Sequence, residues 1–93
     1  MYTHITEIRN ANERLGHHFF EDGNLRFFRS RIGSSVYGGR YFITSEQFDA
    51  NSPRLYTIRE AKPNGRIDTV GEFQQYASHA QATRAAKKLA GES

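Results

Sequence analysis

The chain has 93 residues, which suffices for one domain, expected over residues 1–93, and leaves no room for a second hydrophobic core. It contains no cysteine, which excludes disulfide bonds, cysteine-ligated metals and thiolate catalysis, and its apolar runs are too short for a signal peptide or a membrane span. The formal net charge is +3, and 7 phenylalanines and 5 tyrosines favour an ordered fold, since each aromatic ring buries about 150–250 Å².

The first predicted element is a helix over about residues 4–15. Apolar positions recur there every three or four residues, which is typical of one buried stripe on a helix. That stripe consists of Ile5, Ile8, Ala11, Asn12 and Leu15. Thr3 is the expected N-cap, and Gly16 stands where a left-handed residue ends many helices.

Residues 17–39 allow two interpretations. Leu25, Phe28 and Ile32 recur at helical spacing, which predicts a short helix over about residues 25–32 that ends at Gly33. Read with a period of two, the same stretch is a strand instead, which carries Leu25, Phe27, Arg29 and Arg31 on one face. The glycine-rich tract that follows is expected to be a loop.

From residue 40 the pattern becomes that of β-strands, rich in aromatic and β-branched residues. Strands are predicted over residues 40–46, 54–61 and 66–73. The second and third are joined by a tight turn with Pro63 and Gly65, the strongest local signal in the chain. Short connections pair neighbouring strands antiparallel, which gives a three-stranded meander.

A last helix is predicted over residues 79–90 and is expected to pack on the sheet. Ser78 and Gln81 have the spacing of a capping box, and Gly91 follows the helix. The apolar stripe consists of Ala82, Ala85, Ala86 and Leu89. The expected fold class is therefore α+β, with helices on a three-stranded antiparallel sheet.

The basic residues are unevenly distributed. No acidic residue lies between Asp22 and Glu46, whereas this stretch contains Arg26, Arg29, Arg31 and Arg40. A second basic group consists of Arg84, Lys87 and Lys88 near the end of the chain. Each group is either a solvated surface or a contact site for phosphates or carboxylates, to which arginine is well suited.

Catalytic and metal-binding motifs are weak. Residues 33–38 have the glycine spacing of a phosphate-binding loop, but Gly39 and Arg40 follow where lysine and a hydroxyl residue are required. His17 and His18 are adjacent and point to opposite sides of an extended chain, a poor geometry for holding one metal ion. We expect no enzymatic activity, no cofactor, no metal, no membrane contact and no small-molecule substrate.

The best functional candidate is a basic and aromatic face of the sheet. Strand alternation places Arg40 and Phe42 on one face, with Arg59 on the same surface. Such a ribbon could enter a major groove or stack bases. The predicted nucleic-acid-binding residues are Arg40, Phe42, Arg54, Arg59, Arg66, Arg84 and Lys88. The alternative is that the first helix or residues 17–39 cover Phe42.

The segments LYTIREAKPNGRIDTVGEF and SHAQATRAAKKLA resemble the three-stranded sheet and helix of the plant ethylene-response-factor DNA-binding domain and of phage integrase arm-binding domains. The resemblance implies DNA contacts from arginines and aromatic residues on the sheet. Arg59 and Arg66 match its basic strand positions, and Gly71 and Phe73 match its Gly-x-Phe strand end.

The segment FFRSRIGSSVYGGRYFITSEQFD resembles small phage- and plasmid-encoded proteins of unknown function. This resemblance implies an accessory protein of a mobile element that acts in the cytoplasm of a bacterial host cell. Such proteins include DNA binders and inhibitors of host or defence proteins. For a protein partner, the predicted contact residues are Phe27, Arg29, Arg31 and Tyr37, since arginine and tyrosine are enriched at interface hot spots.

Overall fold

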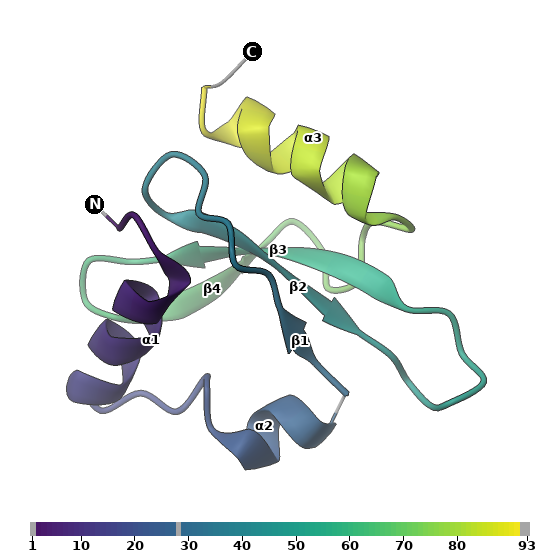
Figure 1. Cartoon of the computed structure of the whole chain (residues 1–93), viewed down its shortest axis with the longest axis horizontal. Coiled ribbons are helices and arrows are strands. Elements are labelled where there is room, and N and C mark those ends of the chain that lie inside the picture. Colours follow the sequence, from purple (N-terminus) through teal and green to yellow (C-terminus); the bar gives the residue numbers. More distant parts are fainter. Residues whose placement is uncertain (1, 28, 92–93) are drawn as a thin grey trace.

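The computed structural model describes residues 2–27 and 29–91 and has an α+β architecture, as the sequence predicts. Its elements are α1 (Ile5–Arg14), α2 (Asp22–Phe27), β1 (Arg31–Ile32), β2 (Tyr41–Glu46), β3 (Leu55–Ala61), β4 (Ile67–Val70) and α3 (His79–Leu89). The strands form one antiparallel sheet in the order β1-β2-β3-β4, with α3 on one side and α1 and α2 on the other (Figure 1). None of the helices in these residues is long and apolar enough to cross a membrane.

The register of the central strands decides which side chains share a face. Phe42 pairs with Arg59 and Ile43 pairs with Ile58 across β2 and β3. Because side chains alternate along a strand, Ile43 and Ile58 lie on the side of α3, whereas Phe42 and Arg59 lie on the side of α1. Each face of the sheet therefore carries apolar side chains on which a helix can pack.

The face under α3 is closed by small side chains. Ala82 and Ala86 are buried against Tyr41, Ile43 and Ile58, and alanine lets the helix lie close to the sheet. Ser78 caps α3 by accepting a hydrogen bond from the Gln81 N–H at 3.2 Å, as predicted. The expectation that Leu89 completes the buried stripe is wrong, because its side chain is 43% exposed beyond the edge of this core.

The opposite face carries the second core. Ile8 from α1 and Phe20 pack on Phe42 and Ala61, and the Phe20 and Phe42 rings stack with centroids 6.0 Å apart. The expectation that Phe42 lies on an open face of the sheet is corrected, since Phe42 is 0% exposed. The helix α1 and the residues that follow it cover this ring.

Buried Asn12 anchors α1 to the rest of this face. Its Nδ2 donates to the Gly65 carbonyl at 2.7 Å, and its Oδ1 accepts from the Phe19 N–H at 3.1 Å. Gly65 has φ 83°, as the predicted turn between β3 and β4 requires. The N-cap of α1 is His4 and not Thr3, since the helix begins at Ile5. Glu7 reaches back to accept from the N–H groups of both Thr3, at 2.9 Å, and His4, at 3.0 Å.

The helix predicted over residues 25–32 is instead the shorter helix α2 followed by strand β1. The Ser30 N–H donates to the Leu25 carbonyl at 2.7 Å and the Arg29 N–H to the Arg26 carbonyl at 3.2 Å, the bond pair of a Schellman helix end. Ile32 then pairs with Thr44, which makes β1 a fourth strand at the edge of the sheet. Strand β4 likewise ends earlier than predicted, since Gly71 has φ 76° and turns the chain.

Candidate anion-binding site

A surface pocket of about 420 Å³ lies where the end of α2 meets the edge of the sheet. Its lining residues are Leu25, Arg26, Arg29, Ser30, Arg31, Gln47 and Arg54, which we call the arginine pocket. Four of these side chains are cationic and none is acidic. The arrangement concentrates positive charge in one concave place, which favours an anion.

The end of α2 positions two of these arginines. Arg29 has φ 52°, the left-handed conformation that glycine usually takes at the end of a Schellman motif. For a residue with a Cβ this conformation costs about 1–2 kcal/mol. The chain therefore places a cation, and not a glycine, where the backbone favours glycine. Arg26 lies on α2 itself and lines the same pocket.

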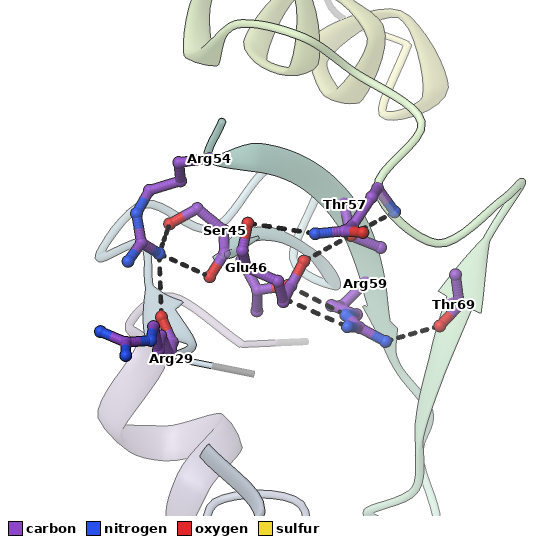
Figure 2. Close-up of polar contacts among 9 residues, drawn as sticks. Arg29, Ser45, Glu46, Arg54, Thr57, Arg59 and Thr69 are labelled. Atoms are coloured by element: carbon purple, nitrogen blue, oxygen red, sulfur yellow. Dashed lines mark hydrogen bonds and ion pairs between the residues drawn. The ribbon is translucent and has the colours of Figure 1, made fainter. Parts of the chain in front are cut away.

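Arg54 is held in place by its own hydrogen bonds (Figure 2). Its Nη1 donates to the Arg29 carbonyl at 2.9 Å, to the Ser45 carbonyl at 3.1 Å and to Ser45 Oγ at 3.0 Å. Its Nη2 donates to Gln47 Oε1 at 3.4 Å. These bonds join the connection after α2 to β2, so that Arg54 builds the wall of the pocket and still contributes its charge.

Arg31 supplies the remaining cation from β1. This strand is at the edge of the sheet, where Arg31 pairs with Ser45 and its side chain is exposed. Arg26 and Arg29 are also exposed, whereas Arg54 is half-buried. Three of the four cations are therefore accessible to a ligand.

The acidic residue that acts on the pocket is Asp49. Its carboxylate accepts from the Asn51 N–H at 2.8 Å and from Ser52 Oγ at 3.0 Å. The Asn51 hydrogen bond is the main cause that lowers the pKa of Asp49, and the positive charge of Arg29 adds a smaller contribution. Asp49 therefore stays ionised and fastens the loop between β2 and β3.

A second arginine site lies under the sheet and is closed. We call it the closed polar cluster, and its members are Thr44, Glu46, Thr57, Arg59 and Thr69. Arg59 donates through Nε to Thr44 Oγ1 at 3.0 Å, through Nη1 to Thr69 Oγ1 at 2.6 Å and through Nη2 to Glu46 Oε2 at 3.3 Å (Figure 2). The second carboxylate oxygen of Glu46 accepts from Thr57 Oγ1 at 2.7 Å.

Burial turns Arg59 into a structural residue. Its side chain is 12% exposed and that of Glu46 is 1% exposed. Desolvation lowers the pKa of Arg59 from its usual value, and Glu46 opposes this shift by stabilising the charged form. The guanidinium also lies over the Phe19 and Phe73 rings, at 5.3 and 5.5 Å from their centroids. Arg59 is therefore not placed to contact phosphates, contrary to the expectation from its strand position.

The other predicted nucleic-acid-binding residues are separated from one another. Arg40 and Arg66 join a chain of ion pairs with Glu60 and Asp68, at 3.7 Å for Arg40–Glu60 and 2.7 Å for Arg66–Asp68. Lys62 lies between these acids, 3.0 Å from Glu60. Arg84 and Lys88 are exposed on α3. Together with the burial of Phe42 and Arg59, this means that no single sheet face carries the predicted set.

The predicted protein-binding set is also divided. Arg29 and Arg31 line the arginine pocket, but Tyr37 packs against the core under α3. The side chain of Phe27 lies outside the described residues. In the described residues no three histidine or acidic side chains come together as metal ligands. Sequence reasoning found three of the pocket arginines as an acid-free basic stretch, but assigned Arg54 to another surface and did not single out Gln47.

Comparison with known proteins identifies the family. Residues 4–87 match the model of DUF7447, a family of unknown function. The match covers most of the chain, so the protein belongs to this family. No curated protein and no solved structure matched the chain.

Proposed function

We propose that this member of the DUF7447 family is a non-enzymatic binding protein whose partner is a nucleic acid, held by phosphate contacts in the arginine pocket. The observation that carries the proposal is the convergence of four arginines, from α2, the turn after it, β1 and the loop after β2, on one pocket without an acidic lining residue. Guanidinium groups match phosphate oxygens bidentately, so this side-chain chemistry suits a phosphate backbone.

The covered sheet explains why the contact surface is proposed at its edge. Phe42 and Arg59 take part in the core and in the closed polar cluster, and the charges of Arg40 and Arg66 are balanced by neighbouring acids. In the arginine pocket, by contrast, no acidic residue among the described lining residues balances the charges of the arginines. The resemblance of residues 27–49 to phage and plasmid proteins supports an accessory role of this kind in a bacterial cytoplasm.

Fluorescence anisotropy with labelled oligonucleotides tests the proposal. If Arg26, Arg29 and Arg31 each neutralise one phosphate of a duplex, log affinity should fall against log salt with a slope of about −2.7, which is about 40-fold between 50 and 200 mM. The variant Arg26→Ala/Arg29→Gly/Arg31→Ala should lose this dependence. The matched control Arg9→Ala/Arg14→Ala removes two exposed cations from α1 and should bind almost as the wild type does.

A host or defence protein is the second candidate partner. The exposed Arg29 and Arg31 favour it, since arginine is also enriched at protein interface hot spots. No oligonucleotide binding by tens of micromolar protein would remove nucleic acid as the partner. Purification from host cells with and without nuclease would then show whether a protein binds instead. If that protein binds the same pocket, the triple variant should fail to recover it.

A further inference from the structure

Phe48 is the most exposed large hydrophobic residue of the described chain, with 77% of its surface accessible. Among the described residues no ring–ring or cation–ring contact involves it. It follows Gln47, which lines the arginine pocket, and neighbouring Cα atoms are about 3.8 Å apart. The backbone of Phe48 therefore adjoins a residue of the arginine pocket, and its ring is open to solvent.

The loop that carries Phe48 is fastened on both sides of the ring. Gln47 Nε2 donates to the Ser52 carbonyl at 2.9 Å, and Gln47 Oε1 accepts from Arg54. On the other side, Asp49 accepts from the Asn51 N–H and from Ser52 Oγ. The loop that carries the exposed ring is thus pre-organised, which lowers the entropy cost of binding a ligand there.

We propose that the arginine pocket and Phe48 form one composite site for single-stranded nucleic acid, with a phosphate in the pocket and a neighbouring base stacked on the Phe48 ring. This inference rests on the proposed function. Basic grooves beside aromatic platforms are the usual means of binding single strands, because every base has a face that can stack. Within a duplex that face is already covered by the next base pair.

The charges around the site favour one placement of phosphate and base. The cations of Arg26, Arg29 and Arg31 attract the phosphates, whereas the carboxylate of Asp49, the residue that follows Phe48, repels them. A base is uncharged and is not repelled there. Phosphates are therefore expected on the α2 side of the site and the base on the side of the loop.

The test titrates one protein with three labelled probes of equal length, which are an oligo-dT strand, the same strand with abasic residues, and a duplex. Stacking contributes about 1–3 kcal/mol per base, so Phe48→Ala should weaken oligo-dT binding about 5- to 150-fold. The same variant should leave the affinities for the abasic strand and for the duplex almost unchanged. The salt slope for oligo-dT should stay near −2.1, since the ring carries no charge, while Arg29→Gly should reduce it by about 0.7.

A second variant provides a direct signal. The chain has no tryptophan, so Phe48→Trp introduces a single one, which should retain oligo-dT affinity and be quenched when a base stacks on it. The control Leu15→Ala removes an exposed apolar side chain from the C-cap of α1 and should change neither the affinity for oligo-dT nor the affinity for the duplex. Urea unfolding of each variant verifies that the fold is intact.

The outcomes separate the two proposals. If oligo-dT and duplex bind alike and Phe48→Ala weakens neither, or if Phe48→Trp is not quenched at saturating oligo-dT, the composite site is overturned and the proposed function stands. If none of the three probes binds, both proposals fail. If Phe48→Ala instead abolishes nuclease-resistant recovery of a host protein, Phe48 belongs to a protein interface.

Discussion

The closed polar cluster and the arginine pocket lie at the same end of β2, yet they use arginine in opposite ways. Arg59 points under the sheet and meets the Glu46 carboxylate, two threonine hydroxyls and two aromatic rings. Arg29 lies in the pocket among other cations and stays exposed. The difference shows that a buried carboxylate draws Arg59 into the fold, whereas Arg29 has no such partner among the described residues and stays exposed.

The largest expected effect comes from opening the closed polar cluster. Arg59→Ala leaves the Glu46 carboxylate buried without its counter-charge, which should cost about 3–5 kcal/mol of unfolding free energy. The double variant Arg59→Met/Glu46→Leu removes both charges and should lower the unfolding free energy less than Arg59→Ala does. Urea unfolding measures both. A single variant as stable as the wild type would show that the cluster is not closed in solution.

The closure of this face also depends on α1, which is fixed at the turn between β3 and β4. A Cβ at Gly65 would lie 2.9 Å from the Ala11 carbonyl oxygen, closer than real contacts allow. Gly65→Ala therefore adds a clash to the about 1–2 kcal/mol of left-handed strain, and should cost at least about 2 kcal/mol. It should also loosen the cover over Phe42.

Gly16→Ala is the matched control for that variant. Gly16 has a similar φ of 86° but has nothing within 4 Å of the added Cβ, so it isolates the backbone strain. The urea midpoint should fall further for Gly65→Ala than for Gly16→Ala. Equal shifts would mean that the contact between α1 and the turn contributes nothing to stability.

Removing a cation from the arginine pocket should have the reverse effect on stability. Arg29→Gly relieves the left-handed strain of about 1–2 kcal/mol but costs about 0.5–1 kcal/mol through the larger entropy of the unfolded chain, so the protein should be unchanged or up to about 1.5 kcal/mol more stable. Nucleic-acid affinity should nevertheless fall. A large loss of stability would indicate that the Arg29 side chain, like that of Arg59, belongs to the fold.

The sequence predicts the local features of this fold well. Ser78, Gly65 and the helical stripes act over short distances, so the bounds of α1, α3, β2 and β3 follow from neighbouring residues to within one position. The end of α2 is not predicted, because a Schellman turn with arginine in place of glycine has no glycine to mark it. Strand β1 is missed for another reason, since two residues carry no usable periodicity.

The candidate site depends on long-range contacts that sequence spacing does not contain. The acid-free stretch around Arg26, Arg29 and Arg31 is visible as a charge pattern. The place of Arg54 is set by hydrogen bonds to residues 9 and 25 positions away, at Ser45 and Arg29. The burial of Arg59 follows from its pairing with Phe42, which puts its side chain on the face that carries the Glu46 carboxylate, and from the cover supplied by Phe19. In the sequence, Glu46 is only a carboxylate at the end of a β-strand, and nothing near it indicates that it is buried against Arg59.

The smallest expected effect is a pH dependence of the loop beside the pocket. Hydrogen bonds from Asn51 and Ser52 hold the folded pKa of Asp49 below its usual value of 3.8. A carboxylate with a lowered folded pKa contributes stability above the unfolded pKa, and this contribution is lost as the pH falls through the folded pKa. Asp49→Asn should therefore be less stable than the wild type at neutral pH, and the gap should shrink only below about pH 4. Urea titrations of both proteins between pH 7 and pH 2 measure this gap, and a gap that shrinks already between pH 7 and pH 5 would assign the loop's stability to a group other than Asp49.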